Sequence, residues 1–360
     1  MIDLATLAAA WGDSPDLDGE LVHVQHLPAR PAIHADPAQP LSPETLERLE
    51  RVGVERLYRH QAKAVDRIRA GRHTVVVAGT AAGKTLCYQI PILETFRDDP
   101  KATAICVYPT KALAQDQARS FQQFGGSAFQ VATYDGDTPT DQRARIRRSA
   151  NVIMTNPDML HVGILPHHAR WADFLYRLRF VVVDELHSLR GIFGTHVAMV
   201  LRRLRRLCNY YGSEPTFVFG SATIGNPGEL AAALCGLDVE VIDQDDSPRG
   251  EQWVALWNPE MTDPEEGRRR SALAEATDLL VDLVRHDVPT IVFARSRKAT
   301  ELIFRWAGER LDADQRRRIA AYRGGYLARE RREIEQRLFA GDLAAVVTTN
   351  ALELGIDVGS

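Results

Sequence analysis

The sequence predicts an α/β protein made of two units, each built on a parallel β-sheet. The length of 360 residues corresponds to about two domains of ordinary size. Short apolar runs rich in β-branched residues alternate with polar segments of helical period, a pattern typical of parallel sheets covered on both faces. A polar stretch at residues 243–249 separates two such series. With 45% hydrophobic and 26% charged residues, the chain can bury a core.

The N-terminal part of the chain carries the weakest pattern. Residues 1–41 are rich in Pro, Ala, Asp and His without a strong period, so we expect an irregular arm with at most one short helix near Leu4–Ala10. A clear helix start follows, because Ser42 suits the N-cap, Pro43 the first helical position and Gly53 the C-terminal stop. We therefore place the first domain at residues 42–245.

This first domain contains a regular alternation of predicted strands and helices. Helical spacing appears at Lys111–Phe124 and Asp141–Arg148. The expected strands, which are short, apolar and bounded by polar residues, are Thr74–Val77, Ala102–Tyr108, Gln130–Tyr134, Asn151–Met154, Phe180–Val183, Thr216–Phe219 and Val239–Ile242.

A second series of the same kind predicts a second, incomplete domain at residues 246–360. Its expected strands are Trp253–Leu256, Thr290–Phe293, Ile319–Tyr322 and Ala344–Thr348. The helical segments between them are Ser271–Arg285, Ala299–Leu311 and Ala328–Phe339.

A glycine-rich loop connects the first predicted strand to a helix. The loop consists of Ala78, Gly79, Thr80, Ala81, Ala82, Gly83, Lys84 and Thr85. In this strand–turn–helix context the backbone N–H groups and the helix N-terminus favour a phosphate group. Lys84 then neutralises the β- and γ-phosphates, and Thr85 places its hydroxyl on Mg²⁺. The alternative, an ordinary glycine-rich turn, does not explain the flanking strand and helix, so the loop predicts an ATP and Mg²⁺ site.

Two adjacent carboxylates follow another buried strand. Asp184 stands at the end of Phe180–Val183, where it can hold Mg²⁺ through water. Glu185 can orient and deprotonate the attacking water. His187, two residues further on, can relay between these carboxylates and another motif. The predicted catalytic residues are therefore Lys84, Asp184, Glu185 and His187.

Charge and cysteine content exclude several classes of protein. The net charge is −4 from 44 basic and 48 acidic residues, so nucleic-acid binding requires local patches. The four cysteines form no CxxC pair, which argues against a cysteine-based zinc site or iron–sulfur cluster. No apolar run reaches the roughly 20 residues of a membrane span, and the N-terminus shows no secretory signal. We expect a cytoplasmic protein.

Further motifs occur in an order that resembles the DEAD/DEAH helicases of superfamily 2. Pro109–Ala114 is similar to motif Ia, Thr155–Leu160 to motif Ib, Ser221–Thr223 to motif III, Thr290–Arg297 to motif IV and Thr348–Asp357 to motif V. The resemblance implies two RecA-like domains that move along single-stranded or forked DNA by hydrolysing ATP. It also implies that Tyr58, Gln61, Gly355 and Asp357 contact the nucleotide. Ala78 departs from the general pattern, which has glycine there.

The same resemblance implies contacts with the nucleic-acid backbone. On the first domain these are Thr110, Lys111, Thr155 and Asn156, and on the second Arg295, Ser296, Arg323 and Thr348. The similarity to motif III implies that Ser221, Ala222 and Thr223 couple the nucleotide site to this groove. The arginines of residues 202–206 alternate with leucines and indicate a solvated helix face. Those at residues 143–148 follow a possible DNA-facing loop at Tyr134–Asp137, and both interpretations stay open there.

The run Asp184–Val197 is similar to one branch of these helicases, the mitomycin repair factor A and RecQ-four-like DNA repair enzymes. The branch implies 3′-to-5′ unwinding in DNA repair. A DEAD-box RNA helicase is less consistent with the sequence Asp-Glu-Leu-His at motif II. A non-catalytic, ATP-dependent binding module is the alternative from another class. No motif VI follows motif V, so we expect a truncated piece that binds nucleotide and hydrolyses it weakly.

Overall fold

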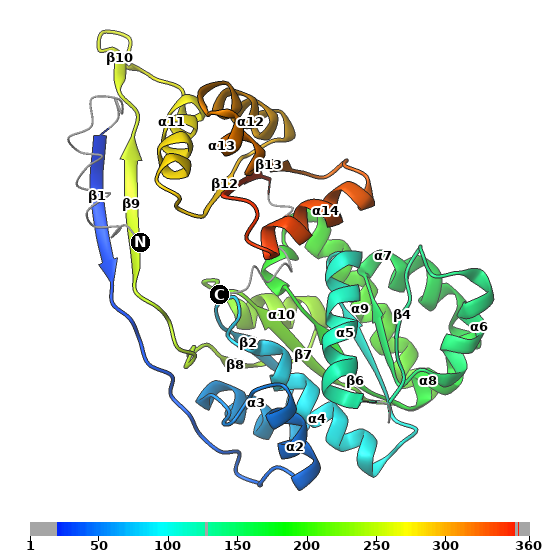
Figure 1. Cartoon of the computed structure of the whole chain (residues 1–360). Helices are drawn as coiled ribbons and strands as arrows, with labels where there is room; N and C mark the ends of the chain where they lie inside the picture. The colour runs from blue at the N-terminus through cyan, green and yellow to red at the C-terminus, as the bar shows by residue number, and fades with distance from the viewer. Residues whose placement is uncertain (1–19, 127–128, 350–351, 353–360) are drawn as a thin grey trace. The chain divides into compact units, whose positions relative to one another are not determined.

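The computed structural model describes residues 20–126, 129–349 and 352. The chain divides into two compact units (Figure 1). The larger unit comprises residues 31–249, and the smaller unit combines residues 1–30 with 250–360. Within the described residues, no helix combines the length and the apolar character that a membrane crossing requires.

The larger unit is built on a seven-stranded sheet with the order β4-β5-β3-β6-β7-β2-β8. All neighbouring strands are parallel, as the continuous apolar runs predict. The strands are β2 Thr74–Val77, β3 Thr103–Val107, β4 Val131–Thr133, β5 Val152–Thr155, β6 Leu178–Val183, β7 Thr216–Ser221 and β8 Glu240–Ile242.

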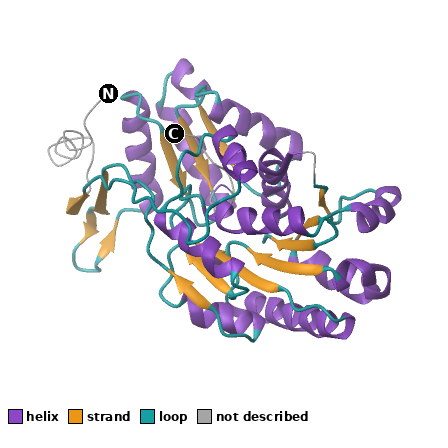
Figure 2. Ribbon diagram, turned by 90° about the horizontal axis from the view of Figure 1, so that it is seen from below, coloured by secondary structure: helices purple, strands orange, loops and turns teal. Residues whose placement is uncertain are grey.

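Helices cover both faces of this sheet (Figure 2). Val75 and Val77 belong to one buried apolar cluster and Val76 to the other, because successive side chains of a strand point to opposite faces. The helices are α2 Pro43–Arg51, α3 Arg59–Arg69, α4 Lys84–Asp98, α5 Lys111–Gly125, α6 Thr140–Ser149, α7 Pro157–Met159, α8 Ala172–Tyr176, α9 Gly191–Tyr211 and α10 Pro227–Cys235. A π-helical turn, Leu160–Ile164, and a 3₁₀ segment, Leu165–Trp171, follow α7.

Helix α2 begins as its sequence predicts. The Ser42 hydroxyl accepts the backbone N–H of Thr45, Pro43 occupies the first turn, and Gly53 adopts a left-handed conformation just beyond the helix. These are the local signals of a helix start and stop.

The smaller unit contains a parallel sheet of three described strands with the order β12-β14-β13. They are β12 Thr290–Phe293, β13 Ile319–Tyr322 and β14 Ala345–Thr348. The accompanying helices are α11 Ala272–Arg285, α12 Arg297–Arg310, α13 Ala313–Arg317 and α14 Ala328–Phe339. Apolar side chains fill both sides of the sheet, since Val347 lies in one buried cluster and Val346 in another.

Two expectations for the chain ends of this unit are wrong. Residues 20–27 are not irregular but form strand β1, Glu20–Leu27, and β9, Gln252–Asn258, does not join the parallel sheet. The two strands pair with each other in antiparallel register, from Glu20 opposite Asn258 to Leu27 opposite Gln252. Both are largely solvent-exposed, so no burial period marks β1 in the sequence, and its hydrogen-bond partner β9 lies far away along the chain. A short hairpin, β10 Met261–Asp263 with β11 Arg268–Arg269, follows β9.

Candidate nucleotide and nucleic-acid site

The glycine-rich loop lies between β2 and α4, as the strand–turn–helix pattern predicts. Ala81 and Gly83 both have left-handed backbone conformations, with φ of 59° and 71°. A β-carbon on Gly83 would lie 2.3 Å from Nε2 of Gln61. Residue 83 therefore needs glycine for its backbone conformation and also for the close approach of α3.

The cationic and hydroxyl side chains of the loop stand at the N-terminus of α4. Lys84 Nζ donates to the carbonyl oxygens of Ala78 at 3.0 Å and Gly79 at 2.7 Å. The Thr85 hydroxyl donates to Oε1 of Gln117 at 3.3 Å. These acceptors are neutral oxygens, which phosphate oxygens can replace. Thr80 and Ala81 are exposed at the tip of the loop, whereas Ala82 is buried.

Asp184 follows the last residue of β6 and is buried. Its Oδ1 accepts the backbone N–H of Glu185 at 2.9 Å, and its Oδ2 accepts the hydroxyl of Tyr88 at 3.3 Å. A β-carbon on Gly220 would lie 2.2 Å from Oδ1, so only glycine leaves room for this carboxylate. Burial raises the pKa of Asp184, although Lys84 acts in the opposite direction. A carboxylate whose charge is penalised by burial fits a cation nearby, and Mg²⁺ needs few protein ligands beside phosphate and water.

Glu185, His187 and motif III lie together. Glu185 has a left-handed backbone with φ of 54°, a conformation that is uncommon outside glycine and tends to occur at functional sites. His187 Nδ1 lies 3.3 Å from Glu185 Oε2 and accepts the N–H of Ala222 at 3.3 Å. The buried Ser221 donates its hydroxyl to the carbonyl of Ala222, and Thr223 is exposed. His187 thus joins the strand ends of β6 and β7.

Tyr58 and Gln61 line a cleft beside the glycine-rich loop. Gln61 Oε1 accepts the N–H of Tyr58 at 2.8 Å, and its Nε2 donates to the carbonyl of Gly83 at 3.0 Å. The cleft measures about 390 Å³ and is also lined by Ala81 and Leu86. This volume falls within the roughly 300–1,000 Å³ of small-molecule sites. Residues of the loop and of α3 therefore share one cavity.

Two residues that the sequence did not single out, His60 and Asp245, contact the backbone of the glycine-rich loop. His60 Nε2 lies 3.1 Å from the carbonyl oxygen of Ala82, and its Nδ1 accepts the N–H of Asp246. Asp245 Oδ2 accepts the N–H of Gly79 at 3.0 Å. His60 adjoins the recognised Gln61, but nothing in the sequence connects Asp245 with a loop more than 160 positions earlier.

The predicted nucleic-acid residues of the larger unit follow neighbouring strands. Thr110 caps α5 by accepting the N–H of Leu113, and Lys111 pairs with Asp137 at 2.9 Å. The hydroxyl of the buried Thr155 donates to the carbonyl of Tyr134 at 2.7 Å, and Asn156 caps α7 by accepting the N–H of Met159. These residues lie at the carboxyl ends of β3 and β5, which are adjacent in the sheet, so they share one edge.

The predicted nucleic-acid residues of the smaller unit differ from one another in exposure and in contacts. Arg295 is exposed, and Ser296 caps α12 by accepting the N–H of Ala299. Arg323 donates to Glu301 at 2.6 Å and lies over the ring of Tyr326, so a carboxylate already balances its charge. Thr348 is buried, with its hydroxyl bonded to the carbonyl of Thr349. Gly355 and Asp357 lie outside the described residues.

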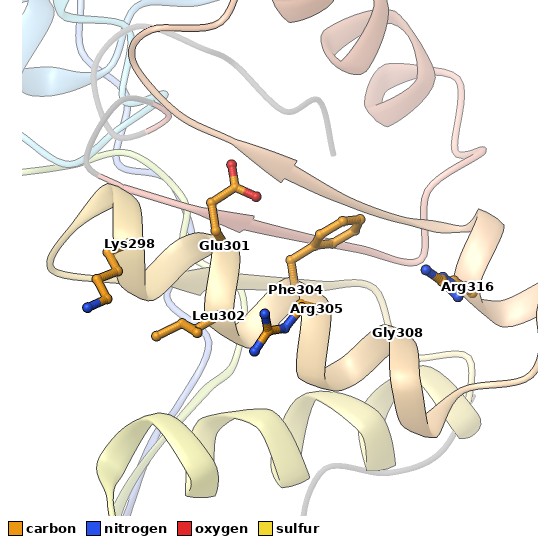
Figure 3. Close-up of a pocket in the computed structure, with 7 residues that line it drawn as sticks. All are labelled: Lys298, Glu301, Leu302, Phe304, Arg305, Gly308 and Arg316. Atoms are coloured by element: carbon orange, nitrogen blue, oxygen red, sulfur yellow. The ribbon is translucent and has the colours of Figure 1, made fainter.

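A separate hollow of about 340 Å³ lies along α12 of the smaller unit (Figure 3). Its side chains include Lys298, Glu301, Phe304 and Arg305. Glu301 is engaged by Arg323 and by Tyr326, and no glycine-rich loop contributes to the lining. The cleft beside Gly83 is therefore the candidate nucleotide site.

Two family models match the chain. The DEAD/DEAH box helicase model matches residues 58–230, and the helicase conserved C-terminal domain model matches residues 273–360. Solved structures with two RecA-like domains resemble the chain, among them a mycobacterial Lhr helicase at 26% identity and a TM-score of 0.67. The chain belongs to the DEAD/DEAH box helicases of superfamily 2.

Individual relatives place it in one branch of this family. The ATP-dependent helicase YprA of Bacillus subtilis is 44% identical over 85% of this chain and 42% of its own length. The helicase hrq1 of Schizosaccharomyces pombe is 44% identical over 85% of this chain and 30% of its own length. The DUF1998 helicase MrfA bound to DNA gives a TM-score of 0.91 at 39% identity, covering 100% of this chain and 48% of MrfA. The chain thus belongs with the MrfA-like and RecQ-like helicases, and it spans less than half the length of these relatives.

Proposed function

We propose that this chain is the ATP-driven motor of a DNA helicase. The observation that carries the proposal is one connected site at the carboxyl ends of β2, β6 and β7. There the loop lysine Lys84, the buried Asp184 and the pair Glu185–His187 meet motif III at Ala222. Ligands of open α/β sheets bind at this end of the strands.

The residues of the site divide the chemistry of ATP hydrolysis among them. Lys84 exchanges the carbonyl oxygens of its loop for oxygens of the β- and γ-phosphates, while Gln61 and Tyr58 face the cleft that receives the base. Thr85, and Asp184 through water, would hold Mg²⁺, which would supply positive charge beside the transferring phosphoryl group. Glu185 orients water and takes its proton. His187 links Glu185 to the backbone of Ala222, so a change in the position of Glu185 during hydrolysis reaches Ser221–Thr223.

Movement along DNA follows from alternating affinity of the two units for one strand. A helicase of this kind grips the sugar-phosphate backbone, so its affinity depends strongly on salt and weakly on sequence. The support for DNA comes from MrfA, which has been solved with DNA and with DNA and AMPPNP. We extend this substrate to the present chain, together with 3′-to-5′ movement, a preference for single-stranded or forked DNA and a role in DNA repair.

The test compares two variants of the site. We expect Lys84→Ala to abolish binding of a fluorescent ATP analogue, because the loop loses its only charge toward the phosphates. We expect Glu185→Gln to bind the analogue normally and to slow DNA-stimulated hydrolysis by roughly 10²–10⁴-fold, the range for loss of a general base. Unchanged nucleotide binding by Lys84→Ala would contradict the assignment.

The same assay separates the remaining alternatives. Stimulation of hydrolysis by single-stranded DNA and not by RNA supports a DNA motor, and the reverse supports an RNA helicase. Nucleotide-dependent DNA binding without any turnover supports a non-catalytic module. Weak hydrolysis by residues 1–360 alone stays a prediction of the sequence, and steady-state turnover with DNA measures it.

A further inference from the structure

A basic pocket lies at the edge of the larger unit, away from the nucleotide cleft. It measures about 350 Å³ and is bounded by α6 on one side and by residues 159–171 on the other. Its charged and aromatic lining consists of Arg143, Arg147, Arg170, His167, Tyr134 and Trp171. No carboxylate is among the described residues that line it. Every ionisable group that faces the pocket is therefore cationic or neutral.

In the described part of the chain, no ion pair balances the guanidinium charges of this pocket. Arg143 donates to the backbone carbonyls of Thr138 at 3.0 Å and Asp135 at 3.2 Å, and these neutral acceptors leave its charge uncompensated. The contact of Arg147 is with the hydroxyl of Tyr134 at 3.5 Å. Arg170 is exposed and has no hydrogen bond or ion pair with any described residue. Charges gathered in a concave surface attract an anion more strongly than the same charges on a convex face.

The floor of the pocket is aromatic and buried. Tyr134 and Trp171 are 2% and 1% exposed, and their rings meet edge to face with centroids 4.9 Å apart. A buried aromatic floor lowers the local dielectric and so strengthens the attraction between guanidinium and anion. Guanidinium groups also match the oxygen geometry of phosphate through paired N–H donors. These features favour a phosphate group as the ligand.

The position of the pocket indicates which phosphate it receives. Tyr134 lines the pocket and begins a loop, residues 134–138, that contacts both predicted nucleic-acid motifs of the unit. Its Asp137 pairs with Lys111 of motif Ia, and the carbonyl of Tyr134 accepts the hydroxyl of Thr155 of motif Ib. The sheet order places β4 beside β5, so the pocket continues the edge on which these motifs lie.

We propose that the pocket of Arg143, Arg147 and Arg170 binds a backbone phosphate of the DNA strand beyond motifs Ia and Ib. This inference rests on the proposed function, because it assumes that the edge of the larger unit carries DNA. Arg143 braces the Tyr134–Thr138 loop and so shapes the pocket. Arg147 and Arg170 supply the donors that are available to the ligand. The contact adds affinity and salt dependence but no sequence preference.

The test uses arginines of the same region as matched controls. Arg147→Ala and Arg170→Ala each remove one charge from the pocket. Arg145→Ala and Arg148→Ala remove one exposed charge from the same helix α6 without touching the lining. Binding of a labelled oligothymidylate is measured over a series of salt concentrations. Binding of a fluorescent ATP analogue, whose cleft is remote from the pocket, reports on the fold.

We expect each pocket variant to bind DNA several-fold more weakly at low salt and to lower the slope of log affinity against log salt by about 0.7, the value for one phosphate of a single strand. We expect the control variants to stay within about twofold of the unaltered chain, because neither Arg145 nor Arg148 lines the pocket. Nucleotide affinity stays the same in all four.

If pocket and control variants bind DNA alike while the unaltered chain binds it well, the pocket assignment is wrong and the proposed function stands. An unaltered chain that binds nucleotide and no DNA overturns both. Arg170→Lys keeps the charge of the side chain, so we expect it to retain the salt slope of the unaltered chain. A salt slope equal to that of Arg170→Ala argues against a phosphate contact.

Discussion

His60 Nε2 lies 3.1 Å from the carbonyl oxygen of Ala82 in the glycine-rich loop, while its Nδ1 accepts the backbone N–H of Asp246 at 3.2 Å. A backbone N–H can only donate, so Nδ1 carries no proton and Nε2–H donates to Ala82. The side chain is fully buried. It joins the phosphate loop to the segment that leaves the larger unit. We regard His60 as a positioning residue for the nucleotide.

The first prediction concerns this bridge. His60→Ala leaves the Ala82 carbonyl and the Asp246 N–H without their partner, and an unsatisfied buried group costs about 1–3 kcal/mol. Because the loop loses its support, we expect affinity for a fluorescent ATP analogue to fall by roughly tenfold, which is about 1.4 kcal/mol. The melting temperature falls as well.

A histidine elsewhere in the unit provides the control. His73 Nδ1 accepts the N–H of Phe217 at 3.0 Å, at the end of the sheet opposite the loop. His73→Ala should lower the melting temperature and leave nucleotide affinity unchanged. If His60→Ala binds the analogue as tightly as His73→Ala does, His60 serves stability alone.

The second prediction is a loss of stability in mild acid. Burial lowers the pKa of His60 and of His73 below the ordinary value. As pH falls through about 6.5, the unfolded chain takes up protons at these histidines and the folded chain does not. The unfolded state then binds more protons, so the free energy of unfolding decreases as pH falls below this value. Above it, both states leave the histidines neutral and the contribution to pH dependence vanishes.

Thermal unfolding between neutral and mildly acid pH measures this effect. The double variant His60→Gln, His73→Gln lacks both titrating groups, so its melting temperature should fall less steeply over the acid range. An equal slope in the variant and the unaltered chain would assign the acid sensitivity to other residues.

The third prediction concerns the hydroxyl that reaches Asp184 from α4. Tyr88 donates to Oδ2 of Asp184, and its oxygen lies 3.2 Å from that of Tyr108. Tyr88→Phe removes a hydrogen bond to a charged acceptor, worth about 1.5–3 kcal/mol. Tyr108→Phe removes only a bond between neutral groups, worth about 0.5–1.5 kcal/mol. We expect urea unfolding to show a larger loss for Tyr88→Phe. A larger loss for Tyr108→Phe would contradict this account of the network.

Local signals in the sequence located most of the parallel strands. Thr74–Val77 and Ile319–Tyr322 are strands over the same residues that the apolar runs predict, and all of their residues are buried. Such runs are readable because strands covered on both faces need apolar side chains at every position. The sequence pattern did not predict strand β1, because this strand is exposed on both faces and depends on β9 for its hydrogen bonds.

Each motif is a short continuous run of residues. The glycine-rich loop, Asp184–Glu185 and Ser221–Thr223 could therefore be identified from the sequence. Their convergence was an expectation based on resemblance. In the structure, His187 provides the contact between Glu185 and Ala222. The contacts of His60 and Asp245 with the loop had no signal in the sequence, because their partners are remote along the chain.

The sequence by itself determined where strands, turns and helices occur, since these depend on apolar period, capping and glycine at nearby positions. Only the tertiary structure decided which strand ends become neighbours. The order β4-β5-β3-β6-β7-β2-β8 brings Asp184 against Gly220 and places the basic pocket beside motif Ib. Strand order is a property of long-range packing and crossover connections, and short-range side-chain patterns do not encode it.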